Sequence, residues 1–156
     1  MGALYVLRVV LISVEALVLA GAWLSWTYFS GEIQGFAASL AVNEEVLKYV
    51  MLLPAALAVW VIREARVLLQ EDKETVRILI DWTDYWRLKT HTWVSLVYAV
   101  VFAGMSLVPW LAKSGISTGE GLVLFLASLV GQLCLAVSVY AARIRVKEII
   151  AHAKAP

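Results

Sequence analysis

The feature that most constrains the fold is a set of four long apolar runs in a chain of 156 residues. The runs cover residues 5–29, 46–62, 90–112 and 121–142. A helix that crosses a bilayer needs about 20 largely apolar residues, and only helices or closed barrels satisfy their backbone hydrogen bonds in lipid. The runs therefore predict an all-α, polytopic membrane protein, in which a single domain over residues 1–156 forms a four-helix bundle.

The composition also indicates a chain surrounded by lipid. Hydrophobic residues make up 62% of the chain and charged residues only 16%, whereas soluble domains average about 45–50% apolar and about 25% charged residues. The seven tryptophans fit this class, because tryptophan concentrates at membrane–water interfaces. The lipid bilayer is therefore the first expected partner.

Charge and cysteine content exclude several classes of protein. The formal net charge is only +1, which disfavours nucleic-acid binding because that function needs a concentrated positive surface. The single cysteine, Cys134, can form neither an internal disulfide nor a cysteine-rich metal site. The sequence has no recognised nucleophile motif, metal motif or phosphate loop. We therefore expect no cofactor, no metal site and no catalytic residues.

Lysine and arginine are unevenly divided between the two ends of the predicted helices. One side collects Arg8, the bases of residues 63–89 and those of the C-terminal tail, whereas the other side has only Lys48 and Lys113. Cytoplasmic loops of membrane proteins carry the excess of these bases. We therefore expect both termini and residues 63–89 to face the cytoplasm, in a plasma (inner) membrane.

Local signals predict where the first two helices end and begin. Gly31 and Gly35 are expected to break the first helix, because glycine is a poor helix former. Asn43 is followed by two glutamates, which predicts an N-cap with acids in the first turn of the second helix. Pro54 predicts a kink in that helix, because proline removes a backbone donor.

Residues 63–89 are highly charged but keep a helical spacing of apolar residues. They predict an extension of the second helix beyond the membrane, followed by an amphipathic stretch anchored by Trp82, Tyr85 and Trp86. Two interpretations remain open for this segment. It is either a solvated helical hairpin with an interfacial aromatic belt or a surface on which a partner protein docks.

A carboxylate, Glu15, interrupts the first run near its middle. In a helix that enters the membrane near residue 5, a rise of about 1.5 Å per residue places Glu15 roughly 15 Å deep. An ionised carboxylate at that depth costs about 2.5–3.5 kcal/mol on insertion scales. Glu15 must therefore be protonated or face a polar interior.

Polar residues on the third and fourth runs provide partners at a similar depth. His91, Ser95 and Tyr98 are spaced by four and three residues, which places them on one stripe of a helix. Ser128 and Gln132 form a second stripe, with Gln132 near the centre of the fourth helix. The faces that carry these stripes are expected to turn toward the first helix.

These stripes predict a buried polar cluster that is connected to the cytoplasmic edge along the third helix. The candidate ion- or proton-binding residues are Glu15, Tyr98, Gln132, Ser128, Ser95 and His91. A structural alternative also stays open. In it, Glu15 is a protonated donor between helices, Tyr98 and Gln132 form interhelical hydrogen bonds, and His91 is an interfacial residue.

Two families of membrane proteins have a similar architecture. A four-span chain with a glutamate in its first helix resembles the small multidrug transporters, but their tight loops and aromatic third-helix signature are missing here. Glu44 and Glu45 resemble the Glu-Glu opening of the second helix in the small membrane subunit of tripartite periplasmic transporters. That subunit has an Arg-Gly-x-His stretch where this chain reads Arg63-Glu64-Ala65-Arg66. Both are similarities of architecture alone.

The sequence leaves two functions open. The first is a small channel or transporter-like protein, assembled as a homo-oligomer, in which Glu15 binds a proton or cation. The second is a non-catalytic interaction protein, either an accessory subunit of a larger membrane complex or an immunity or exclusion factor. Its docking surface would then contain Trp82, Tyr85 and Trp86. Replacement of Glu15 by glutamine separates the two, because only the first function needs the carboxylate.

Overall fold

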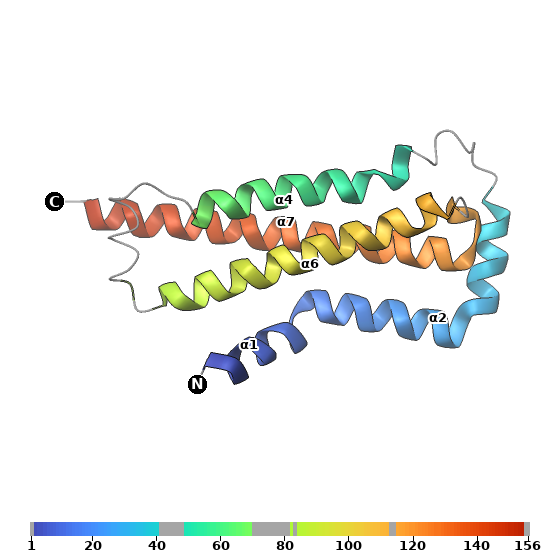
Figure 1. Ribbon diagram of the computed structural model, residues 1–156, viewed down its shortest axis with the longest axis horizontal. Helices are drawn as coiled ribbons and strands as arrows, with labels where there is room; N and C mark the ends of the chain where they lie inside the picture. The colour runs from blue at the N-terminus through green and yellow to red at the C-terminus, as the bar shows by residue number, and fades with distance from the viewer. Residues whose placement is uncertain (1, 41–48, 70–81, 83, 113–114, 155–156) are drawn as a thin grey trace.

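The computed structural model describes residues 2–40, 49–69, 82, 84–112 and 115–154. Within these ranges the chain is helical apart from short turns, and it contains no strand. The helices are α1 (Gly2–Leu11), α2 (Val14–Ser39), α4 (Leu53–Leu69), α6 (Tyr85–Leu111) and α7 (Gly119–Lys154), with a short 3-10 helix, η1 (Gly115–Ser117), before α7 (Figure 1). The prediction of an all-α protein is confirmed.

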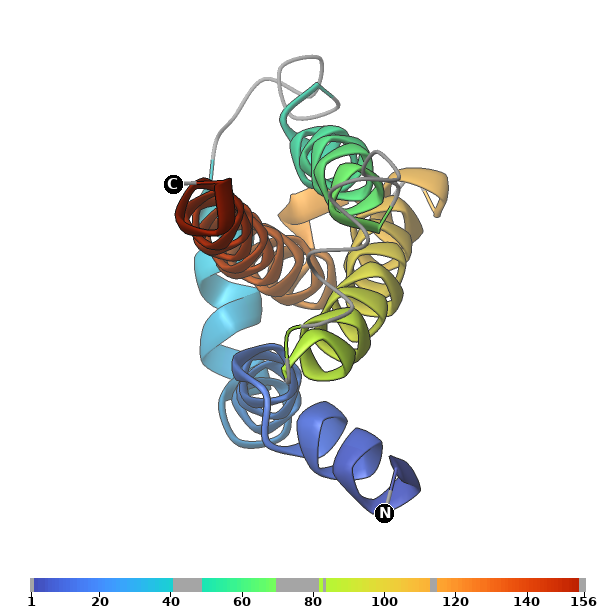
Figure 2. The same ribbon diagram turned by 90° about the vertical axis from the view of Figure 1, so that its left-hand side faces the viewer.

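Helix α7 is the element around which the other long helices are arranged. It packs against α2, α4 and α6, and α4 also packs against α6. Both chain termini lie at the same end of the bundle as the end of α4 and the start of α6 (Figure 1). We call this the terminal end, and the opposite end, where α6 turns into α7, the turn end. Helix α1 is splayed away from the rest when the molecule is viewed from its left-hand side (Figure 2).

A core of buried apolar side chains joins α4, α6 and α7. Its members are Val61, Ala65, Leu68, Tyr98, Ala99, Phe102, Leu135, Val139 and Val146. The packing of α6 against α7 at this point needs a glycine, since a Cβ atom on Gly131 would clash with the Phe102 ring. Phe102 is itself fully buried, so its ring is enclosed by protein and cannot move aside into solvent.

The turn between α6 and α7 is built from glycines and one long-range hydrogen bond. Gly115 has a φ of 61°, a conformation that glycine adopts without steric cost. A Cβ atom on Gly121 would clash with the Gly115 carbonyl oxygen. The Gly119 N–H donates to Gln34 Oε1 at 2.7 Å, which satisfies a free N–H at the start of α7. This bond also fixes the end of α2 against α7.

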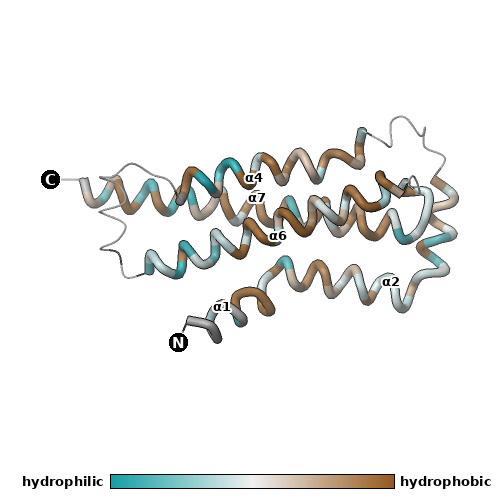
Figure 3. The backbone as a smooth tube through the Cα atoms, viewed as in Figure 1, coloured by the Kyte–Doolittle hydropathy of each residue, from teal (hydrophilic) through white to brown (hydrophobic). Residues whose placement is uncertain are grey.

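Two helices in the described part of the chain are long and apolar enough to cross a membrane. They are α6 over Tyr85–Leu111 and the segment Gly119–Ala153 of α7. Large apolar side chains stand exposed on their outer faces, including Val97 at 61% and Val137 at 70%. Hydrophobic residues fill the middle of the helices, and hydrophilic residues gather at the terminal end (Figure 3). This pattern is typical of helices whose outer faces contact lipid.

The prediction of one continuous helix over residues 5–29 is wrong. The chain leaves the helical conformation at Ile12 and Ser13, which separate α1 from α2. The predicted helix break at Gly31 and Gly35 is also misplaced. Both glycines lie inside α2, and the kink falls earlier, at Phe29, where φ is −124° and ψ is 19°. Beyond Phe29, α2 runs across the turn end of the bundle (Figure 1).

The other predicted boundaries differ mainly in length. Residues 49–51 are helical, and α4 begins after a turn at Leu52, so Pro54 lies in a first helical turn, where proline is tolerated. Helix α4 continues past residue 62, as predicted for the start of the charged segment. Helix α6 begins five residues before residue 90, and α7 continues beyond 142 to Lys154. The predicted N-cap at Asn43 and most of the amphipathic stretch lie outside the described residues.

Replacement of Gly131 by alanine is expected to lower the thermal stability of the detergent-solubilised protein, because overpacking a filled core costs about 1–3 kcal/mol. The matched control is Gly104→Ala in α6, where an added Cβ atom meets nothing within 4 Å. There, alanine should stabilise the helix by about 0.5–1 kcal/mol. Thermal unfolding followed by size-exclusion chromatography compares the two. Equal stability would show that the Gly131–Phe102 contact does not limit the approach of α6 to α7.

Candidate functional site

The interruption between α1 and α2 is produced by Ser13. Its backbone is extended, with φ −85° and ψ 157°, and its hydroxyl accepts a hydrogen bond from the Ala16 N–H at 3.1 Å. Serine is a favoured N-cap because its side chain replaces a missing helical acceptor. The same hydroxyl donates to the Val10 carbonyl at 3.3 Å. Ser13 therefore ends one helix and starts the next.

The interruption leaves a backbone acceptor that α6 uses. In a continuous helix the Val10 carbonyl would accept from the N–H of residue 14. Here it accepts from Tyr98 Oη at 2.7 Å. This bond ties the end of α1 to the middle of α6, and it satisfies a carbonyl that the helix break has freed.

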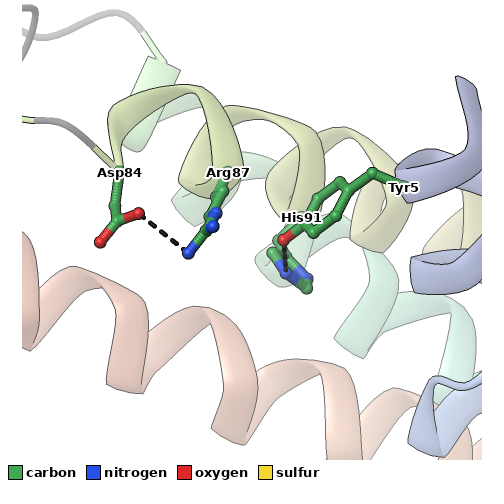
Figure 4. Close-up of polar contacts among 4 residues, drawn as sticks. All are labelled: Tyr5, Asp84, Arg87 and His91. Carbon is green, nitrogen blue, oxygen red and sulfur yellow. Dashed lines mark hydrogen bonds and ion pairs between the residues drawn. The ribbon is translucent and has the colours of Figure 1, made fainter. Parts of the chain in front are cut away.

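A second contact holds the start of α1 against α6. A hydrogen bond of 3.1 Å joins Tyr5 Oη to His91 Nε2 (Figure 4). The Tyr5 ring also packs against Trp86, with 4.8 Å between the ring centroids. Helix α1 therefore rests on α6 through Tyr5 near its start and through Val10 near its end.

The carboxylate of Glu15 lies in the first turn of α2, two residues after the N-cap. The expectation that it occupies the middle of a helix is therefore wrong. The N-terminal end of a helix carries a partial positive charge that favours an acid, which explains why a carboxylate is tolerated here. Glu15 is only 9% exposed. No hydrogen bond or ion pair joins it to any residue that the structure describes.

Glu15 lines a groove between α1, the start of α2, α6 and α7, which we call the α1 groove. Its volume is about 790 Å³. Its walls are apolar, and its polar lining residues are Tyr5, Arg8, Ser13, Glu15, His91, Ser95, Cys134 and Ser138. The groove exists because the chain break allows α1 to diverge from α7 (Figure 2).

The α1 groove brings together three of the six predicted site residues, Glu15, Ser95 and His91. The other three direct hydrogen bonds to backbone carbonyls and do not line the groove. Tyr98 donates to Val10, as described above. Ser128 Oγ donates to the Leu124 carbonyl at 2.6 Å, and Gln132 Nε2 donates to the Ala99 carbonyl at 2.8 Å. Gln132 Oε1 is buried without a partner among the described residues.

The three aromatic residues predicted to form a belt or docking surface have different environments. Trp82 is partly buried and packs against the core that joins α4, α6 and α7. Trp86 is 46% exposed and contacts Tyr5. Tyr85 lines a separate groove between α4 and α6.

Sequence reasoning missed several residues that line the α1 groove. Tyr5 and Arg8 share a face of α1 because they are spaced by three residues, and this spacing is visible in the sequence. Ser13 also carried a signal, since a serine followed two residues later by an acid is a typical helix start. Ser138 lies six residues after Gln132, on a different face of α7. No pattern in the sequence links Ser138 to the other residues of the groove.

The α1 groove is lined by one carboxylate, several hydroxyls, one thiol, one imidazole and one guanidinium. Within the described ranges, no group of three histidine, cysteine or acidic residues could hold a metal ion. A carboxylate without a fixed partner can bind a proton, a cation or a cationic group of a ligand.

Comparison with protein-family models, curated proteins and solved structures finds no match for this chain. Its function must therefore be argued from the geometry of the groove.

Replacement of Tyr98 by phenylalanine is expected to loosen α1, because it removes the better of the two hydrogen bonds to the Val10 carbonyl. Such bonds are worth about 0.6–2 kcal/mol in membrane proteins. Deuterium exchange at residues 5–14 should rise several-fold. The matched control is Tyr140→Phe in α7, where the tyrosine is 57% exposed. If both variants exchange like the wild type, the bond does not hold the helix break in place.

Proposed function

We propose that this chain is an integral membrane protein that takes up a proton on Glu15 from the α1 groove, as part of a small channel or transporter. The observation that supports this most is the state of Glu15. Its side chain is nine-tenths buried, has no partner among the described residues and borders a groove of about 790 Å³. An ionisable residue inside a membrane protein is costly, and by default it marks an ion or proton path.

In this proposal the chain crosses the membrane four times. Helices α6 and α7 support two of them by length and apolar composition. Helix α4 has 17 residues and would span about 26 Å. The fourth pass combines α1 with α2 as far as the kink at Phe29. All four run between the terminal end and the turn end (Figure 1).

The proposed orientation places the terminal end in the cytoplasm. Most of the bases that the structure describes belong to the end of α4, the start of α6 and the end of α7, and hydrophilic residues gather at this end of the bundle (Figure 3). These bases include Arg63, Arg87 and Arg145. Since cytoplasmic segments carry the excess of lysine and arginine, both termini are proposed to lie on that side of a plasma (inner) membrane.

The α1 groove provides a route from the terminal end to Glu15. Ser95 lies one helical turn from His91 along α6, and both line the groove. His91 is exposed and bonded to Tyr5, so it lies where the route meets the charged end of the bundle. Protons are proposed to reach Glu15 from the cytoplasm through water in this groove, past the hydroxyl of Ser95.

A proton fits the α1 groove better than a metal cation does. Calcium takes six to eight oxygen ligands and magnesium needs near-ideal octahedral coordination, whereas Glu15 is the only acid among the residues that line the groove. Arg8 also borders it, and its positive charge disfavours a second cation nearby. A proton needs one carboxylate oxygen and no further ligand.

Release of the proton from Glu15 to the other side of the membrane requires either a change of structure or a neighbouring subunit. Beyond Glu15, a second groove of about 550 Å³ follows α2 and α7 toward the turn end, from Val18 to Phe36. Its lining is apolar except for Ser25 and Glu32. A proton on Glu15 therefore meets no continuous polar route in a single chain, among the residues described. This favours helix movement or a homo-oligomer that completes the path.

Replacement of Glu15 by glutamine is expected to reduce proton flux in proteoliposomes to the background of empty vesicles, because glutamine keeps the shape but cannot exchange a proton. The matched control is Glu120→Gln, an exposed acid in the first turn of α7, which should retain wild-type flux. A pH-sensitive dye inside the vesicles gives the rate after a potential is applied. Replacing sodium by choline outside tests whether a metal cation is carried instead.

Wild-type flux in the Glu15→Gln variant would contradict the proposal. An absence of flux in the wild type, together with native co-purification of a second membrane protein, would favour the interaction protein instead. In that case Glu15 is a structural residue, and the variant should differ from the wild type only in stability.

A further inference from the structure

A third groove lies between α4 and α6 at the terminal end, and we call it the basic groove. Its volume is about 630 Å³. Ile62 and Arg66 line it from α4, and Lys89, Trp93, Leu96 and Val100 line it from α6. The α6 residues are spaced by four, three and four positions, so they form one continuous stripe along the helix.

The positive charges of the basic groove are not neutralised by any described residue. Arg66 and Lys89 are both exposed. The described acids nearest to them in sequence are already paired with other bases. Glu64 forms an ion pair with Arg143, and Asp84 forms one with Arg87 at 3.1 Å (Figure 4). Two bases from two different helices therefore border one groove, and neither forms an ion pair with any residue that the structure describes.

The basic groove changes from charged to apolar along its length. Lys89 and Val100 are eleven residues apart on α6, which corresponds to about 16 Å along a helix. Trp93, at 55% exposure, lies between them. Helix α6 changes from hydrophilic to hydrophobic in the same direction (Figure 3). An occupant that matches this groove has an anionic group at one end and a long apolar chain at the other.

We propose that the basic groove binds one anionic phospholipid, with its phosphate between Arg66 and Lys89 and an acyl chain along Leu96 and Val100. Arginine suits phosphate because its planar group donates two parallel hydrogen bonds. Basic pockets between membrane helices on the cytoplasmic side bind phospholipid head groups. Tyr85, which also lines the groove, and Trp93 are amphipathic side chains of the kind that lie at head-group level.

Other occupants match only half of the groove. An acidic peptide or free phosphate would neutralise Arg66 and Lys89 but leave the apolar stripe uncovered. A zwitterionic lipid would cover the stripe but bring no net negative charge. The proposal depends on membrane insertion and is independent of the role of Glu15, so either can fail without the other.

The test is native mass spectrometry of the full-length protein in detergent, titrated with phosphatidylglycerol or phosphatidylcholine of the same acyl chains. The wild type should retain one phosphatidylglycerol at least tenfold more tightly than phosphatidylcholine. The double variant Arg66→Gln with Lys89→Gln should bind phosphatidylglycerol roughly thirtyfold more weakly, given the usual strength of two such charges. The matched control is Arg63→Gln with Arg145→Gln, which removes two exposed bases outside the groove and should bind like the wild type.

Two further measurements separate a lipid from a phosphate ion. Val100→Trp fills the apolar half of the groove and should weaken phosphatidylglycerol binding while leaving both bases in place. Inorganic phosphate at millimolar concentration should not displace the lipid. Equal binding by the groove variant and the control variant overturns the proposal, and so does displacement by inorganic phosphate. If the double variant does not fold, the preference of the wild type for phosphatidylglycerol and the Val100→Trp result decide.

Discussion

The structure depends on one local interaction, the capping of α2 by Ser13. Because the chain leaves the helix at this point, α1 can turn aside and rest on α6 instead of continuing α2 along α7. The same cap places Glu15 in a first helical turn, where the partial positive charge of the backbone favours an acid. It also frees the Val10 carbonyl, which Tyr98 then uses to hold α1 in its new direction. The groove, the acid and the anchoring of α1 therefore have one common cause.

Helix α6 lines both the α1 groove and the basic groove, with a different stripe of residues on each side. His91 and Ser95 face the α1 groove, whereas Lys89 and Trp93 face the basic groove. On its remaining side, α6 is fixed to α7 by the tight contact between Phe102 and Gly131.

The sequence predicts the class of fold because long apolar runs allow few alternatives, and α6 and α7 lie close to their predicted positions. The break at Ser13 was missed because it rests on one hydroxyl inside an apolar run, without glycine or proline to mark it. For the kink at Phe29 the local signal was misleading. Gly31 is a poor helix former and predicted a break two residues later, but Gly31 stays helical and the kink falls at Phe29. The helical stripe of His91 and Ser95 was sufficient to place both in the α1 groove.

Tyr98, Ser128 and Gln132 do not line the α1 groove, and Tyr98 and Gln132 form interhelical hydrogen bonds, as the structural alternative expects. The contrast between Gln132 and Glu15 shows why the proposed function rests on Glu15. Gln132 is fully enclosed, and its amide donates to the Ala99 carbonyl while Oε1 lacks a partner in the described structure. A neutral amide oxygen can remain unpaired at a cost of about 1–3 kcal/mol, and no occupant could reach it. A carboxylate in the same state would cost more when ionised, yet Glu15 borders an open groove that a proton can enter. Burial alone therefore identifies both residues as unusual, and access to the groove is the difference that supports the proposed proton uptake by Glu15.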